Sequence, residues 1–284
     1  MTLAKPELGR TPGRRPTLVL APGMACDAAV WEPQVARLSD VANIVILDYG
    51  ATRSVTAMAV RALAAADDRL FVAGHSMGGR VALEMIRLAP DRVRGLCLLG
   101  TEHRPRPDGA AGEAETAGRR ALLAVARAEG MQEMGRRWLP ALLGSGARSD
   151  ETLAKTLLAM FGRGSAAAME AQISAGYDRP DHAGLLPRIT CPVLLIAGEE
   201  DALRPASVHR EMMGLIGSAR LLLLQGCGHM MTLERPADVS AAMRGWLLDA
   251  AGQNSKVSKG GHQGPHNWER NNDQLNANHD RLAG

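Results

Sequence analysis

Six short apolar runs alternate along the chain with longer stretches of helical periodicity. They lie at residues 17–21, 43–48, 70–73, 93–100, 192–198 and 219–226. Within each run apolar residues follow one another without polar alternation, as expected for strands of a parallel sheet covered by helices on both faces. Helices are predicted at 54–66, with Ser54 as N-cap, and at 81–89, 206–216 and 236–250. The pattern predicts an α/β fold with a mostly parallel sheet flanked by helices.

Residues 101–188 interrupt this alternation. They are rich in Ala, Arg, Met and Leu, have helical periodicity and contain no strand pattern. Their position between the fourth and fifth runs predicts a helical cap over the carboxyl edge of the sheet, where sites in such folds lie. We therefore divide the chain into a leader (1–16), a core (17–100 and 189–251), the cap (101–188) and a polar tail (252–284) that is expected to be disordered.

The composition excludes several classes of partner. A formal net charge of +3, with scattered Lys and Arg, argues against nucleic acid. No apolar stretch is long enough to cross a bilayer or to form the core of a signal peptide, so no membrane partner is expected. Because aromatic residues make up only 3% of the chain, we expect a pocket lined by Met and Leu rather than by rings.

The cysteines and tail histidines give no sign of a metal site. The chain has four cysteines, Cys26, Cys97, Cys191 and Cys227. None belongs to a C-x-x-C pair, and we interpret them as buried thiols of a cytoplasmic protein. His262, His266 and His279 are spaced too widely and irregularly for a ligand set. We expect neither a metal nor an organic cofactor.

A glycine-flanked serine joins the third apolar run to the next helix, in the segment Gly74-His75-Ser76-Met77-Gly78. A G-x-S-x-G segment between a strand and a helix forms a tight, strained turn that presents the serine hydroxyl above the sheet. The helix that follows directs its N-terminal N–H groups toward the same place. Since a hydroxyl is a poor nucleophile alone, Ser76 is a candidate only if a base and an acid accompany it. The alternative is a glycine-rich turn with an idle serine.

Candidate partners for Ser76 follow the last two predicted strands. His229 comes after the flexible segment Gly226-Cys227-Gly228 and is the expected general base. Asp201 lies furthest past the fifth strand and is the expected acid. The less favoured candidates are His103, His182 and His209 for the base, and Glu199, Glu200, Asp178 and Asp181 for the acid. We expect those three histidines to be surface or packing residues.

Acyl transfer also needs N–H donors for the oxyanion. The backbone N–H of Met77, next after the serine, is one candidate. The second is the N–H of Met24, in the loop PGMACD after the first strand, where Gly23 permits the backbone to turn the amide inward.

These segments resemble the α/β-hydrolase superfamily, and in particular its small, esterase-like, cap-bearing branch. The resemblance covers roughly residues 17–250 and rests on LAPGMACDAAVW, GHSMGG, GEEDALRP and GCGHMMTLERP, in the family's order. It implies Ser76 as nucleophile, Asp201 as acid, His229 as base, and the Met24 and Met77 amides as oxyanion hole. Pro22-Gly23 stands where many relatives have His-Gly, and the leader is short for the usual N-terminal hairpin.

The resemblance implies hydrolysis of a small-molecule carboxylic ester with a small or medium acyl group, through an acyl-enzyme on Ser76. Lactones, enol-lactones, thioesters and some carbon–carbon bonds of ring-cleavage products need the same machinery. Two alternatives stay open: a non-catalytic member that only binds a ligand, and cofactor-free oxygen chemistry or perhydrolysis. The sequence carries no indication of the oligomeric state.

Overall fold

The computed structural model describes residues 15–66 and 69–252. All but the last two residues of the predicted leader, and all but the first residue of the predicted tail with its three histidines, lie outside these ranges. None of the helices in the described ranges is both long and apolar enough to cross a membrane.

Six strands form one sheet in the order β2-β1-β3-β4-β5-β6, and every neighbouring pair is parallel. The strands are β1 (Thr17–Ala21), β2 (Asn43–Ile46), β3 (Leu70–His75), β4 (Val93–Leu99), β5 (Val193–Gly198) and β6 (Ala219–Leu224). Each of the six apolar runs therefore forms a strand, and the predicted parallel sheet is confirmed.

The main difference from the prediction is at the end of β3. The apolar run ends at Ala73, but the strand continues through Gly74 and His75 to the residue before Ser76. Gly74 stays in the ladder because it pairs with Ala21 of β1 on one side and Leu98 of β4 on the other. A central strand can thus continue through a glycine that looks like a loop residue in the sequence.

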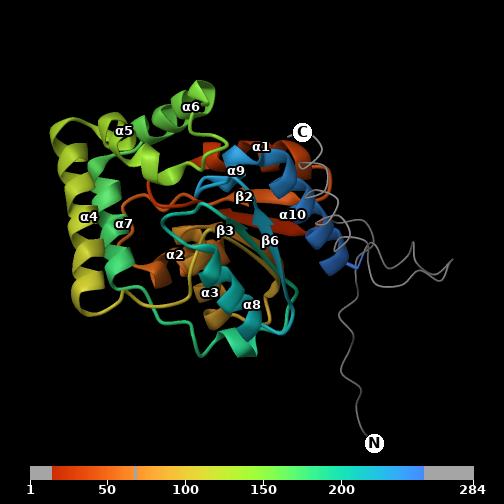
Figure 1. Ribbon diagram of the computed structural model, residues 1–284. Helices are drawn as coiled ribbons and strands as arrows, with labels where there is room; N and C mark the ends of the chain where they lie inside the picture. Colours follow the sequence, from red (N-terminus) through yellow and green to blue (C-terminus); the bar gives the residue numbers. More distant parts are fainter. Residues whose placement is uncertain (1–14, 67–68, 253–284) are drawn as a thin grey trace, which may run out of the picture.

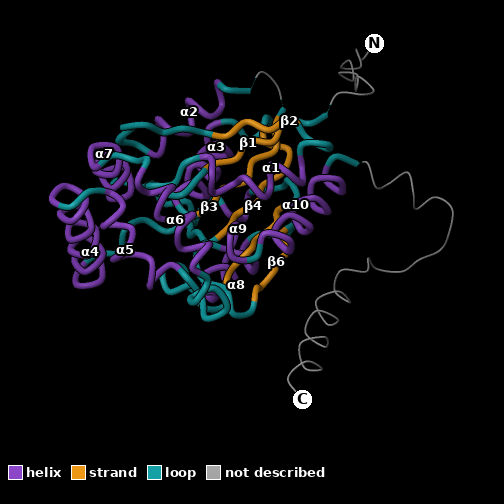
Figure 2. The backbone as a smooth tube through the Cα atoms, turned by 90° about the horizontal axis from the view of Figure 1, so that it is seen from above, coloured by secondary structure: helices purple, strands orange, loops and turns teal. Residues whose placement is uncertain are grey.

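Helices cover both faces of the sheet (Figures 1 and 2). They are α1 (Glu32–Leu38), α2 (Val55–Ala64), α3 (Met77–Leu88), α8 (Ala206–Leu215), α9 (Met231–Glu234) and α10 (Pro236–Ala250), with short 3₁₀ turns η1 (Ala28–Trp31) and η2 (Leu186–Arg188). α1 packs with α10, whereas α2 packs with α3 on the other side of the sheet. Ser54 caps α2, since its hydroxyl accepts a hydrogen bond from the Ala57 N–H. The sequence pattern did not predict α1 or α9.

Four helices lie between β4 and β5, at the position of the predicted insertion. They are α4 (Gly109–Ala128), α5 (Met131–Leu142), α6 (Glu151–Gly162) and α7 (Ala166–Tyr177), and we call them the cap helices. Figure 1 shows them together outside the sheet, with α4 beside α7. The predicted absence of strands in this segment is confirmed.

The central strands are buried on both faces, as their unbroken apolar pattern requires. Every residue of β3 and β5 is buried. On the α10 side, Phe71 of β3 meets Trp246 edge to face, with ring centroids 5.7 Å apart and planes at 88°. This rigid core fixes where the carboxyl ends of the strands lie.

Glycines let α3 begin directly after β3. A Cβ at Gly78 would collide with the carbonyl oxygen of Ala21 in β1, and one at Gly74 would collide with the backbone of Gly78. The helix can therefore approach β1 only because these positions lack a side chain.

We expect Gly78→Ala to lower the free energy of unfolding by about 3 kcal/mol or more, because the added methyl forces α3 away from β1. Gly118→Ala in α4 is the matched control, since nothing lies within 4 Å of a Cβ there. It should be neutral or stabilising by up to about 1 kcal/mol. Urea denaturation measures both changes, and equal tolerance of the two would contradict this account of the turn.

Candidate active site

The strand order places a crevice between the carboxyl ends of β1 and β3. The chain leaves β1 toward β2 on one side, whereas β3 leads to β4 on the other side. Connections that diverge in this way open a crevice at the sheet edge, which is where ligands bind in open α/β sheets. Ser76 follows β3, and Met24 lies in the loop after β1, so the two border the same crevice.

Ser76 occupies a strained turn. Its φ of 54° and ψ of −115° lie in a region that L residues rarely adopt. Three hydrogen bonds hold this conformation: the Ser76 N–H donates to the Leu99 carbonyl (2.8 Å), and the Ser76 carbonyl accepts from the Gly79 N–H (3.0 Å) and the Thr101 hydroxyl (2.7 Å). The side chain is partly exposed, toward the crevice.

The structure brings Ser76, His229 and Asp201 together. His229 Nε2 lies 2.9 Å from Ser76 Oγ, and His229 Nδ1 lies 2.7 Å from Asp201 Oδ2. Both His229 and Asp201 are buried, with 3% of each exposed. The second carboxylate oxygen, Asp201 Oδ1, accepts the N–H groups of Leu203 and Arg204 at 2.9 Å each. The loop after β5 thereby orients the carboxylate through its Oδ1, and His229 binds its Oδ2.

The surroundings of Asp201 favour its ionised form. Burial acts to raise the pKa of this carboxyl, but the charge and hydrogen bond of His229, with the N–H groups of Arg204 and Leu203, outweigh it and hold the pKa below its usual value. An ionised Asp201 binds a protonated Nδ1. Nε2 is then free to accept the Ser76 proton, which is the tautomer a general base needs.

The less favoured candidates for the acid make contacts with residues other than His229. Glu199 is exposed, and the Glu200 carboxylate accepts hydrogen bonds from the Ser145 N–H and hydroxyl, each at 2.6 Å. Asp178 and Asp181 are exposed residues of the segment after α7, where Asp181 accepts the Ala183 N–H. Of the acids considered from the sequence, Asp201 is the one bonded to His229.

The rival histidines are buried packing residues. His182 Nε2 lies 2.9 Å from the buried Glu84 carboxylate, and His209 Nε2 accepts the Thr101 N–H at 3.2 Å. His103 Nε2 lies 3.6 Å from a carboxylate oxygen of Glu211. None of the three contacts Ser76.

The backbone N–H groups of Met24 and Met77 border Ser76. Met77 begins α3, and a Cβ at Gly23, the residue before Met24, would lie 3.3 Å from Ser76 Cβ. The hydrogen bonds of the described residues include no acceptor for either N–H.

His75 contributes to the site although the sequence suggested no role for it. Its Nε2 lies 2.8 Å from the His229 carbonyl oxygen, and the two rings are 5.0 Å apart. Burial and the nearby charge of His229 lower the pKa of His75 to about 3, so the ring stays neutral and its Nε2–H donates to the carbonyl. This bond fixes the backbone of His229.

Glu234 anchors the loop that carries His229. Its carboxylate accepts N–H groups from Gly228 (3.0 Å) and Met230 (2.9 Å), on either side of the histidine, and from Gly144 (2.9 Å) after α5. It is the one carboxylate of the segment GHMMTLE, which begins just before His229, and this is the local signal that could have marked it.

A small pocket of about 10 Å³ lies over Ser76, and we call it the inner pocket. This volume holds about one water molecule. His229, Met24 and two cap residues, Trp138 and Phe161, are among its walls. We expected a pocket lined by Met and Leu rather than by rings, but these two rings line the inner pocket together with Met24, Met230 and Leu142. Their centroids lie 6.0 Å apart in a stacked arrangement. Few aromatic residues suffice when the cap places two of them at the site.

A second pocket of about 440 Å³ lies between the loops after β1 and β2 and the cap helices, and we call it the outer pocket. Its size is typical of ligand sites. Met131, Met160 and Met169 line it, in line with the expected methionine-rich lining. Cys26 borders both pockets, so the outer pocket adjoins the inner one.

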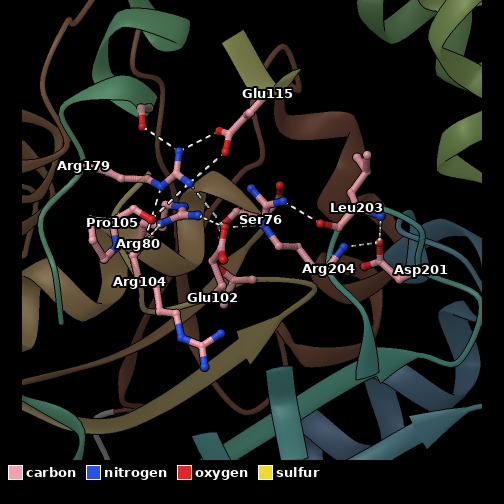
Figure 3. A network of polar contacts seen from close by, with 12 residues as sticks. Ser76, Arg80, Glu102, Arg104, Pro105, Glu115, Arg179, Asp201, Leu203 and Arg204 are labelled. Carbon is pink, nitrogen blue, oxygen red and sulfur yellow. Dashed lines mark hydrogen bonds and ion pairs between the residues drawn. The ribbon is translucent and has the colours of Figure 1, made fainter. Parts of the chain in front are cut away.

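An arginine–glutamate network lies beside Ser76 (Figure 3). It consists of Arg80, Glu102, Glu115, Arg179 and Arg204. Glu102 binds Arg80 and accepts from Arg204 Nε at 3.1 Å, while Arg179 binds the cap residue Glu115 at 2.6 Å. Arg204 also donates its N–H to Asp201. The network thereby ties the Asp201 loop and the end of β4 to α4.

A parallel sheet with a serine on a strained strand-to-helix turn defines the α/β-hydrolase class. A model of the alpha/beta hydrolase family matches residues 18–242, and the chain belongs to this family. The resemblance read from the sequence motifs is thus confirmed.

Three similar proteins illustrate the range of this family. A proposed carbamate hydrolase, RutD, of Stutzerimonas stutzeri (strain A1501) is 27% identical over 86% of this chain and 96% of its own length. The pimeloyl-[acyl-carrier protein] methyl ester esterase of Nitrosomonas europaea is 29% identical over 80% of this chain and 93% of its own. The structure of a thermophilic esterase from Thermogutta terrifontis superposes with a TM-score of 0.73 at 25% identity, covering 84% of this chain and 91% of that one. The similar proteins are hydrolases with different substrates.

The buried histidines predict a loss of stability in acid. Burial lowers the pKa of His75 to about 3 and that of His209 to about 4, both below the usual value near 6.5. Unfolding therefore takes up protons below pH 6.5, and each of the two should cost about 2 kcal/mol of stability between pH 7 and pH 5. Urea unfolding across this range measures the loss. In His209→Gln, unfolding in acid should take up one proton fewer, so the free energy of unfolding should fall less steeply as the pH is lowered. An unchanged slope would contradict a buried, neutral His209.

Proposed function

We propose that this chain is a serine hydrolase that cleaves a carboxylic ester with a small or medium acyl group. Ser76 is the nucleophile, His229 the general base and Asp201 the acid that orients it. The observation that carries the proposal is the continuous hydrogen-bonded chain from Ser76 Oγ through both nitrogens of His229 to Asp201. Such a chain activates a hydroxyl that is otherwise too weakly nucleophilic.

The reaction proceeds in two steps. His229 Nε2 takes the hydroxyl proton while Ser76 Oγ attacks the ester carbonyl, and the imidazolium then protonates the departing alcohol. Water attacks the resulting acyl-enzyme, with His229 again accepting a proton, and the acid leaves as Ser76 recovers its hydrogen. Asp201 stays ionised throughout and stabilises the imidazolium, which its lowered pKa supports.

The N–H groups of Met24 and Met77 form the proposed oxyanion hole. Their lack of another acceptor in the described ranges supports this role, as does the close approach of Gly23 to Ser76. Met77 is the first residue of α3, so the positive end of the helix dipole adds to its N–H. Donors aimed at the developing negative charge lower the barrier because they need no reorganisation during the reaction.

The two pockets favour a short reacting group with a flexible extension. The inner pocket admits little more than the reacting carbonyl, whereas the outer pocket and its methionines suit an aliphatic portion. The methyl ester esterase among the similar proteins supports an ester. The similarity to RutD makes a carbamate a second candidate, since attack on its carbonyl needs the same residues. Lactones, enol-lactones and thioesters are further candidates for the same reason.

The first test replaces the nucleophile. Ser76→Ala should reduce turnover of p-nitrophenyl acetate by ~10⁴-fold or more and abolish labelling by a fluorophosphonate, because no hydroxyl remains to attack. Ser54→Ala, at the N-cap of α2, is the matched control and should keep both activity and labelling. Labelling that persists in Ser76→Ala would refute the nucleophile. A folded wild-type protein with neither labelling nor turnover would indicate a member that only binds a ligand.

The second test separates Asp201 from its neighbours. Asp201→Asn should reduce kcat by ~10⁴-fold with little change in KM, because the amide no longer holds His229 in the required tautomer. Glu200→Gln is the control, since Glu200 contacts Ser145 and not His229. Steady-state kinetics of both variants distinguish the roles, and equal losses would contradict them.

A further inference from the structure

The proposed oxyanion loop contains a second strained residue. Ala25, immediately after Met24, has a φ of 60°. Among the non-glycine residues of the described ranges, only Ala25 and Ser76 have a positive φ. An L residue in this left-handed region is unfavourable unless its surroundings hold it there. Met24 and Ala25 are the two central residues of a turn that the Cys26 N–H closes by donating to the Gly23 carbonyl at 3.2 Å. The conformation of Ala25 therefore helps to hold the turn that carries the Met24 N–H.

A cap residue holds this strained position. The Ala25 N–H donates to Gln172 Oε1 at 2.8 Å, and Gln172 lies in α7 with 7% of its surface exposed. The other end of the same amide, Nε2, donates to the Gly50 carbonyl after β2 at 3.4 Å. The Gln172 amide is therefore fixed from both sides, and its oxygen faces the loop.

The strain of Ala25 and the strength of one hydrogen bond are of similar size. The bond to Gln172 can therefore decide whether the loop keeps its observed conformation. The bond is also partly shielded from water, because only 7% of the surface of Gln172 is exposed. A shielded hydrogen bond contributes more than an exposed one.

We infer that Gln172 is a positioning residue that makes the oxyanion hole depend on the closed cap. The inference rests on the proposed function. Gln172 lies in α7, so its hydrogen bond to the Ala25 N–H exists only while this cap helix lies over the loop. When α7 moves away, Ala25 loses its acceptor and the strained loop is released. When α7 returns over bound substrate, Gln172 restores the Met24 amide to its place beside Ser76.

An ion pair on the same cap helix serves as the control. The Glu170 carboxylate of α7 binds Arg127 of α4 at 2.7 Å. Their side chains are 40% and 56% exposed, and such surface pairs contribute little. Neither residue is among those that line the inner or the outer pocket. The pair therefore separates a general disturbance of α7 from control of the strained residue.

The experiment replaces the acceptor while keeping the size of the side chain. Gln172→Leu should lower kcat for p-nitrophenyl acetate by about 10- to 100-fold with KM nearly unchanged, because the oxyanion is met by a poorly placed donor. Affinity for a trifluoromethyl ketone, whose adduct places an oxyanion beside Ser76, should fall by a similar factor. Gln172→Glu retains an acceptor oxygen and should recover most of both losses. Glu170→Leu, the same replacement two residues away on α7, should leave kcat within about twofold of wild type.

Several results would overturn the inference. One is an unchanged kcat in Gln172→Leu, and another is an equal loss in Gln172→Leu and Gln172→Glu. A loss confined to KM would indicate a substrate contact instead. If Gln172→Leu does not fold, as judged by circular dichroism, Gln172→Ser replaces it, because its hydroxyl is too short to reach Ala25. A wild-type enzyme that is inactive and unlabelled would refute the proposed function itself, whereas serine-dependent activity that ignores Gln172 would refute only this inference.

Discussion

The turn between β3 and α3 is the constraint on which the rest of the site depends. Ser76 adopts its unfavourable backbone because β3 is paired on both sides and Leu99 and Thr101 hold the turn through hydrogen bonds. The strain is of the order of 1–2 kcal/mol, which a buried central strand can absorb. Because Ser76 is fixed at the end of a rigid strand, the loops after the other strands must place their residues within reach of its side chain.

The partners reach Ser76 from strands at different positions in the sheet. Asp201 follows the buried strand β5, and its carboxylate is oriented by its own loop. His229 follows β6, an edge strand that is paired on one side only. Three carboxylate bonds from Glu234 and one from His75 compensate for this by fixing the backbone around the histidine. The part of the site on the least supported strand has thus the densest set of polar anchors.

Much of the fold could be predicted from the sequence because its signals are local. An apolar run marks a buried strand, and a glycine-rich segment after it marks a turn. The same reasoning singled out Ser76, Asp201 and His229, since each follows such a run, and the structure joins the three by hydrogen bonds. It placed the end of β3 too early because Gly74 interrupts the run without interrupting the ladder.

The contributions of the cap could not be predicted in this way. Trp138, Phe161 and Gln172 reach the crevice through tertiary packing of amphipathic helices, and nothing in their local sequence distinguishes the inward residues that border a site from those that fill a core. The aromatic content shows the same limit. The aromatic content is an average over the whole chain, but the walls of the inner pocket depend on two rings at particular positions.

The cap contacts both halves of the proposed machinery, and it does so by different means. On the base side, the His229 N–H donates to the carbonyl of Leu142 at the end of α5 (2.7 Å), which is a backbone contact. On the oxyanion side, the contact is the side chain of Gln172 with Ala25. Backbone contacts persist through most substitutions, whereas a side-chain contact is lost with one. Variation of the cap sequence can therefore change how the oxyanion loop is held while the position of the base is retained, which lets one scaffold serve hydrolases with different substrates.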